Sequence, residues 1–103
     1  MYQLTALYSH PEDPTAFDKH YRDVHAVLAA KFPGLKKFTK SWPGPGQDGS
    51  KPSYYFIATL SWDSEAEFQA AIGSPEGQAG LADLPNFAGA GVDILAGPSE
   101  DVV

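Results

Sequence analysis

The chain contains no cysteine. This absence excludes disulfide bonds, thiolate zinc sites, iron–sulfur clusters and a cysteine nucleophile. Any chemistry must therefore depend on other side chains, and histidine is the one whose ordinary pKa lies nearest neutral pH.

Basic residues are also scarce. Seven Lys and Arg residues stand against 13 Asp and Glu residues, which gives a net charge of −6 and a pI of about 4.7. A nucleic-acid groove needs a basic stripe that neutralises phosphates, and an anionic membrane surface attracts basic segments. We therefore expect neither nucleic acid nor membrane as a partner.

Long apolar runs are missing too. No segment approaches the roughly 20 apolar residues that span a bilayer. The first ten residues, MYQLTALYSH, have neither the basic segment nor the apolar segment of a signal peptide. We expect a cytoplasmic protein with a single domain over residues 1–103, because this length fits one core.

Two kinds of pattern predict the secondary structure. Alternating apolar and polar residues predict strands, and capping residues such as Asp13, Ser64 and Ser74 predict helix starts. Gly- and Pro-rich segments predict a loop at 43–52 and a turn at 85–91. The expected strands cover 2–9, 35–42, 53–62 and 92–97, and the expected helices cover 14–32 and a region from 63 to 84 that is broken near Gly73.

The order of these elements is β-α-β, loop, β-α-β. This order is typical of the ferredoxin-like split βαβ fold, an α+β architecture with a four-stranded antiparallel sheet and helices on one face. The other face would then be bare, and the first and third strands carry bulky residues on both sides. Because a large exposed apolar face is unusual, we expect a homodimer whose two sheets pack into a shared barrel.

A helical wheel at about 100° per residue gives the first helix an apolar stripe. His20 and His25 lie near opposite edges of this stripe, and their directions differ by roughly 140°. Helical metal pairs use i,i+3 or i,i+4 spacing, so we expect these two rings not to converge on one ion and expect no metal site. Asp18 and Asp23 point to solvent. The stripe comprises Phe17, Tyr21, Val24, Leu28 and Phe32.

Two interpretations of these histidines stay open. Both can be boundary residues at the edge of a core face. Alternatively, His25 acts as a general base or acid, and His20 or Tyr21 orients the substrate or stabilises an enolate-like oxygen. Asp83 and Asn86, near the end of the second helical region, are assigned no chemistry beyond local hydrogen bonds.

Aromatic side chains with a few polar groups among them are typical of a ligand pocket. We expect a small hydrophobic molecule, aromatic or cyclic, to bind between the first helix and the sheet. His10 ends the first strand, where it either lies at the mouth of that crevice or is an ordinary loop residue. The candidate substrate-binding residues are His10, Tyr8, Phe17, Tyr54, Phe56 and Trp62.

Several segments together resemble the EthD family. They are YSHPEDPTAFDKHYRDVHAVLAAKFPGLKKF and SPEGQAGLADLPNFAGAGVDIL. The first segment contains the FDxHYxxxH helix and the PGL helix stop, and the YY strand lies between the two segments. One departure is Val27, where the family often has proline. His20, Tyr21 and His25 match the family's most recognisable motif.

The resemblance implies the dimeric α+β barrel fold more firmly than it implies an activity. The family is named for a gene cluster for ethyl tert-butyl ether degradation and is commonly catalogued under oxidoreductase activity. Proteins of the same fold include cofactor-independent monooxygenases, muconolactone isomerases, polyketide cyclases and haem-degrading enzymes. Fold alone does not fix function.

Three functions follow as hypotheses. The first is an enzyme that needs no cofactor and moves protons on a small hydrophobic compound, with monooxygenase-like, isomerase-like or dehydratase-like outcomes. The second is an accessory protein that binds such a compound without changing it. The third is a haem-binding barrel with a histidine as axial ligand.

Overall fold

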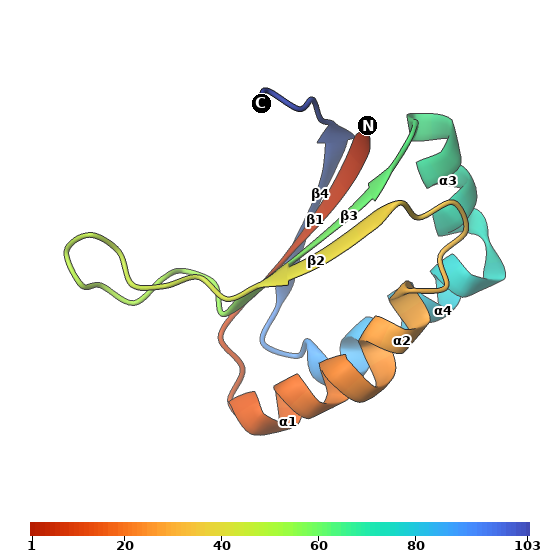
Figure 1. The fold of residues 1–103 in the computed structure, drawn as a ribbon. Helices are drawn as coiled ribbons and strands as arrows, with labels where there is room; N and C mark the ends of the chain where they lie inside the picture. The colour runs from red at the N-terminus through yellow and green to blue at the C-terminus, as the bar shows by residue number, and fades with distance from the viewer.

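The computed structural model describes residues 1–103 as a four-stranded sheet covered on one side by helices (Figure 1). The strands pair in the order β2-β3-β1-β4, and every neighbouring pair is antiparallel. The ferredoxin-like α+β prediction is therefore confirmed. The elements are β1 (Tyr2–Tyr8), α1 (Pro14–His20), η1 (Tyr21–His25), α2 (Ala26–Ala29), β2 (Lys37–Ser41), β3 (Phe56–Trp62), α3 (Glu65–Gly73), α4 (Pro75–Phe87) and β4 (Val92–Pro98).

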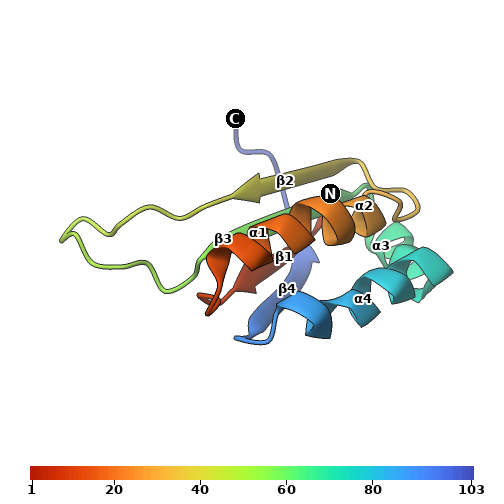
Figure 2. The ribbon, with the colours of Figure 1, turned by 90° about the horizontal axis from the view of Figure 1, so that it is seen from below.

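The alternation of side chains along the strands decides which face the helices cover. On β3, Phe56, Ala58, Leu60 and Trp62 are all buried beneath the helices. The opposite face bears Gln3, Thr5 and Leu7 on β1, which pair with Ser61, Thr59 and Ile57 of β3, and no helix covers it (Figure 2). Figure 2 shows α1, α2 and α4 together on the covered side.

The helices begin where the capping residues predict. The side chains of Asp13, Ser64 and Ser74 accept hydrogen bonds from the backbone N–H groups of Ala16, Glu67 and Gly77. These contacts satisfy donors that the first turn of a helix leaves free. After α2 the chain turns through Gly34, whose φ of 70° lies in the left-handed region that glycine tolerates.

The first helix differs from the prediction at its centre. Residues Tyr21–His25 form a π-helical segment, whose hydrogen bonds run from i to i+5 and which holds more residues per turn than an α-helix. The buried stripe is therefore Phe17, Tyr21, His25 and Ala29 at steps of four. The expectation that Val24 belongs to the core was wrong: its side chain is 39% exposed.

The second helical region is longer than expected. Residues 85–91 were expected to form a turn, but α4 continues through Pro85 to Phe87. Proline removes one donor from the helix, yet its fixed φ is compatible with helical backbone, so the chain direction persists. This extra turn brings Asn86 and Phe87 alongside α1.

The buried side chains form one hydrophobic cluster of 11 residues between the sheet and the helices. At one end of the sheet, the rings of Tyr8, Phe17, Tyr21 and Phe56 contact one another, with centroids 4.5–6.2 Å apart. At the other end, Trp62 packs against Phe68. No helix combines the length and apolar character needed to cross a bilayer.

Candidate proton-transfer site

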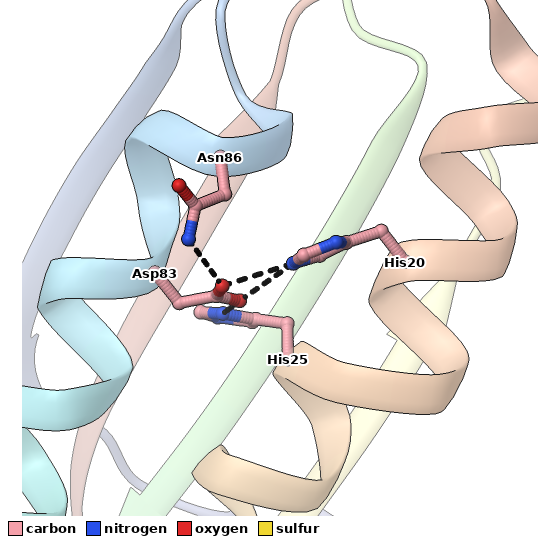
Figure 3. Close-up of polar contacts among 4 residues, drawn as sticks. All are labelled: His20, His25, Asp83 and Asn86. Atoms are coloured by element: carbon pink, nitrogen blue, oxygen red, sulfur yellow. Dashed lines mark hydrogen bonds and ion pairs between the residues drawn. The ribbon is translucent and has the colours of Figure 1, made fainter.

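The carboxylate of Asp83, on α4, lies between the two histidines of the first helix (Figure 3). His20 Nε2 is 2.9 Å from Asp83 Oδ1 and 3.0 Å from Oδ2, and His25 Nδ1 is 3.0 Å from Oδ2. The side-chain amide of Asn86 donates to Oδ1 at 3.0 Å. Asp83 is only 5% exposed, so this is a buried acid with three donors around it.

The expectation that His20 and His25 diverge was wrong. It assumed 100° per residue, whereas the π segment gives a smaller rotation per residue between the two positions. The angle between residues five apart is then smaller than on an α-helix, and both rings reach the same carboxylate. They do so as hydrogen-bond donors, and no group of three or more His, Asp or Glu side chains is arranged to hold a metal ion.

Opposing effects set the charge of the cluster. Burial lowers the pKa of His25, and its hydrogen bond to Asp83 opposes that effect only in part. Burial acts to raise the pKa of Asp83, but the bonds from Asn86, His20 and His25 outweigh it, so the pKa lies below the ordinary value. At neutral pH the cluster is therefore a carboxylate beside a neutral His25.

The ionised carboxylate fixes the tautomers of both rings, because it can only accept hydrogen bonds. His25 then has its proton on Nδ1 and His20 has its proton on Nε2, an assignment that follows from the hydrogen-bond network. His25 Nε2 is left as a lone-pair nitrogen, and in the neutral form of His20 its Nδ1 is the free one. An imidazole that is oriented by a carboxylate and has a free second nitrogen is suited to act as a general base.

Phe87 holds both imidazoles in place. Its ring lies nearly parallel to His20 at a centroid distance of 5.1 Å, and 4.7 Å from the ring of His25. Tyr21 packs against the other side of the cluster, 5.3 Å from His25. The imidazoles therefore have aromatic neighbours as well as a polar anchor.

Two spaces adjoin the cluster. The inner pocket lies under η1 and α4 and has a volume of only about 40 Å³. Its lining is almost wholly apolar, and the lining residues with polar side-chain atoms are Tyr8, Tyr21 and His25. The outer cavity holds about 550 Å³ and is open to solvent. It is lined by Pro11, Glu12, Asp13, Ala16, Phe17, His20, Asn86, Phe87, Gly89 and Ala90.

Of these two spaces, the outer cavity is the one large enough for a substrate-sized molecule, because ligand pockets typically measure about 300–1,000 Å³. His20 faces it with a side chain that is 26% exposed, compared with 9% for His25. The ionisable groups at its rim are the acids Glu12 and Asp13, and no Lys or Arg lines it. Its charge therefore favours uncharged ligands over anions.

The structure brings together some of the expected site residues and separates others. Tyr8, Phe17, Tyr21 and Phe56 pack in the aromatic cluster beside His20 and His25. Burial raises the pKa of Tyr8 and of Tyr21, so both phenols keep their protons at neutral pH.

Three other candidates lie elsewhere. His10 bonds through Nε2 to the carbonyl oxygen of Pro52 at 2.7 Å. The hydroxyl of Tyr54 donates to Asp93 at 2.8 Å. Trp62 is fully buried at the far end of β3, where its indole N–H donates to the carbonyl oxygen of Pro33. None of the three lines the outer cavity or the inner pocket.

Sequence reasoning missed Asp83, Asn86 and Phe87. A signal was present, because Gly77, Gly80 and Asp83 follow one another at steps of three on the buried side of α4. An acid on a buried helical stripe requires polar partners, since an unpaired buried charge is costly. The two histidines were the available partners.

The chain is a ferredoxin-like α+β protein, because its four-stranded antiparallel sheet has helices on one face. Its candidate site is a buried cluster of two histidines and a carboxylate. The model of the family described as "EthD domain" matches residues 9–91. The chain therefore belongs to the EthD family.

Two relatives agree with this assignment. The chain is 43% identical over 103 residues to an uncharacterized 11.0 kDa protein in the thcB-thcC intergenic region of Rhodococcus erythropolis, covering 100% of this chain and 99% of that protein. It is 33% identical to an ethyl tert-butyl ether degradation (EthD) family protein of Bacillus halodurans, whose crystal structure superposes with a TM-score of 0.90 over 97% of this chain and 99% of that chain.

More distant structures share the fold alone. The chain is similar to SnoaB, a cofactor-independent oxygenase of Streptomyces nogalater (14% identity, TM-score 0.65, 99% of this chain and 94% of that chain). It is also similar to a dimeric ferredoxin-like protein of Thermobifida fusca (20% identity, TM-score 0.67, 92% and 87%).

Proposed function

We propose that this protein catalyses proton transfer on a small, uncharged, hydrophobic compound that binds in the outer cavity. The observation that supports the proposal is the contact between His20 and Asp83: a buried carboxylate orients an imidazole at the wall of a cavity of about 550 Å³. The fold of a cofactor-independent oxygenase, SnoaB, is a further support, because it shows that such a scaffold can work without a cofactor.

His20 is the proposed base in preference to His25, since the pocket beside His25 is too small for a ligand. His20 Nδ1 removes a proton from the carbon next to a carbonyl group, and the imidazolium that forms is stabilised by the carboxylate of Asp83. Asn86 lines the same cavity, and its second amide N–H can donate to the oxygen on which the enolate charge develops.

The fate of the enolate decides the reaction class. Return of the proton to another carbon gives isomerisation, loss of a β-hydroxyl as water gives dehydration, and reaction of the enolate with molecular oxygen gives oxygenation. In this proposal His25 is a positioning residue, because it acts through Asp83 and packs beneath Phe87.

We further propose that the protein is a homodimer formed through the bare face of the sheet. Leu7 and Ile57 are neighbours on that face, and Leu95 of β4, next to Thr5, is 61% exposed. The dimeric ferredoxin-like protein of Thermobifida fusca supports this arrangement through its shared fold.

The second candidate is an accessory protein that binds the same compound without transforming it. The observation in its favour is that Asp83 is satisfied by three donors of the protein itself, as in a cluster that only stabilises a fold. The two candidates differ in whether carbon-bound protons exchange.

The test uses 1-indanone, an uncharged bicyclic ketone with exchangeable protons beside its carbonyl. In deuterated buffer the protein should accelerate loss of the C2 proton signal, and His20→Gln should reduce the rate about 10²-fold or more, the usual contribution of a general base. Asp63→Asn, at the far end of the molecule, is the control and should keep the wild-type rate.

Saturation-transfer difference spectra on the same sample separate the candidates. Binding of the ketone without exchange favours the accessory protein. Exchange at the wild-type rate in His20→Gln, together with loss of exchange in His25→Gln, would assign the base to His25 instead.

A further inference from the structure

A second cavity, here called the side cavity, lies on the other side of the first helix, between it and the edge of the sheet. Its volume is about 330 Å³. It shares only Phe17 with the outer cavity and only Tyr21 with the inner pocket. Its lining residues are Phe17, Asp18, Tyr21, Arg22, Lys40, Trp42 and Phe56.

Lys40 lies on an unusual side of its strand. In β2 it pairs with Ala58 of β3, whose side chain is buried under the helices, so Lys40 shares the covered face of the sheet. Lys37 lies on the opposite, bare face, where it pairs with Ser61. Lys40 makes no ion pair, whereas Lys36 is paired with Asp63.

Trp42 offers an aromatic surface beside this lysine. It is 57% exposed, and its ring lies 5.3 Å from that of Phe56 in an edge-to-face arrangement. Its indole N–H makes no hydrogen bond, in contrast to that of Trp62, which donates to Pro33. A free indole N–H and a free ammonium group therefore lie at the same cavity.

Two cations line the side cavity although the chain has a net charge of −6. The side cavity is lined by two cations, Arg22 and Lys40, and one carboxylate, Asp18. That carboxylate accepts a hydrogen bond from the hydroxyl of Tyr55 at 2.9 Å, and Arg22 is paired with Asp23 at 2.9 Å. Lys40 is the charge without a partner in the protein.

From these observations we infer that the side cavity binds a small planar aromatic anion, such as an aromatic carboxylate. The exposed ring of Trp42 would contact the anion beside the largely buried rings of Phe17 and Phe56, and Lys40 with the indole N–H of Trp42 would bind the carboxylate. The outer cavity has the acids Glu12 and Asp13 at its rim and disfavours anions, so the two spaces differ in the ligands that they select.

The opposing explanation for Lys40 is that a charge near an edge strand prevents two sheets from joining edge to edge. That role needs the charge alone and predicts no ligand. The aromatic walls and the free indole N–H have no part in it, whereas a binding site uses all of them.

The probe is 2-naphthoate, a planar two-ring carboxylate, and its uncharged counterpart is 2-naphthamide. Titration calorimetry should give a Kd for 2-naphthoate on the order of 1 mM or tighter, and the amide should bind about tenfold more weakly. In ¹H–¹⁵N spectra the indole resonance of Trp42 should shift with naphthoate, and that of Trp62 should not.

Lys40→Met keeps the length of the side chain and removes its charge. It should weaken naphthoate binding about tenfold and leave the amide unaffected, and Lys36→Met is the matched control that should leave both affinities unchanged. Unchanged naphthoate affinity in Lys40→Met, no binding at all, or shifts at His20 instead of Trp42 would each overturn the inference. None of these outcomes depends on proton transfer at His20, so the two proposals fail separately.

Discussion

At the scale of single residues, Asp83 determines the properties of the site. A buried carboxylate is stable only when hydrogen bonds replace the water that it loses, and hydrogen bonds to charged groups contribute about 1.5–3 kcal/mol each. Asp83 accepts such bonds from His20, His25 and Asn86. The same bonds fix which nitrogen of each imidazole is free, so the stability of the cluster and its suitability for chemistry have one cause.

The pH dependence of stability should reveal the buried His25. Because burial lowers its pKa below 6.5, the unfolded chain binds more protons than the folded one between the folded pKa and 6.5. The free energy of unfolding should therefore rise with pH through this window and fall as the pH drops below 6.5. The lowered pKa of Asp83 adds a second loss below 3.8.

Urea unfolding at a series of pH values measures this dependence. In His25→Gln the slope just below pH 6.5 should become smaller, since the buried titrating group is removed. A wild-type stability that rises as the pH falls from 7 to 5 would contradict a His25 that is buried and neutral.

Single residues also show how far the sequence could predict the site. His20, Tyr21 and His25 could be found from their motif and their place beside an apolar stripe, and the structure puts all three in one cluster. Asp83 could not be paired with them, because its distance from His25 is 58 positions along the chain and only the packing of two helices brings them together.

At the scale of elements, the π-helical segment η1 determines which side chains reach the core. It behaves as one extra residue within an α-helix, and it turns Val24 outward and His25 inward. Strands and helix caps could be predicted because alternation and capping are local. The π segment could not be predicted, because it departs from the 3.6-residue period. The continuation of α4 through Pro85 could not be predicted either, because proline usually ends a helix.

Deletion of Val24 tests this interpretation of η1. The deletion removes one exposed residue, and Tyr21, His25 and Ala29 should then share one face of a regular α-helix. We expect a folded protein with a melting temperature close to that of the wild type. Circular dichroism and thermal melts are the measurement.

Deletion of Gln69, in the regular helix α3, is the matched control. Phe68 and Ala71 are buried three residues apart in that helix, and loss of Gln69 would place them about 200° apart, so one of them should leave the core. Equal destabilisation by the two deletions would contradict the description of η1 as one inserted residue.

At the scale of the whole molecule, the bare face of the sheet is the feature that the chain alone does not explain. The order of the elements predicted a sheet with helices on one face, and the structure confirms that helices cover only one face (Figure 2). Leu7, Ile57 and Leu95 lie on the other face among threonines, which suits a partner with the same surface.

Leu95→Lys tests the proposed dimer. Analytical ultracentrifugation of the wild type should show a dimer, and the variant should be mainly monomeric because two lysines would be brought into one apolar interface. Val27→Lys is the control: this residue is 49% exposed on the helical side, so the variant should remain dimeric. A monomeric wild type at micromolar concentration would refute the proposal.

We expect one ionised carboxylate, Asp83, to hold both histidines in opposite tautomers. Long-range ¹H–¹⁵N correlation spectra of ¹⁵N-histidine-labelled protein at neutral pH measure this directly. They should show a proton on Nδ1 of His25 and on Nε2 of His20. A proton on Nε2 of His25 with a bare Nδ1 would contradict it, because that nitrogen could then only accept a hydrogen bond and the carboxylate would have to be protonated.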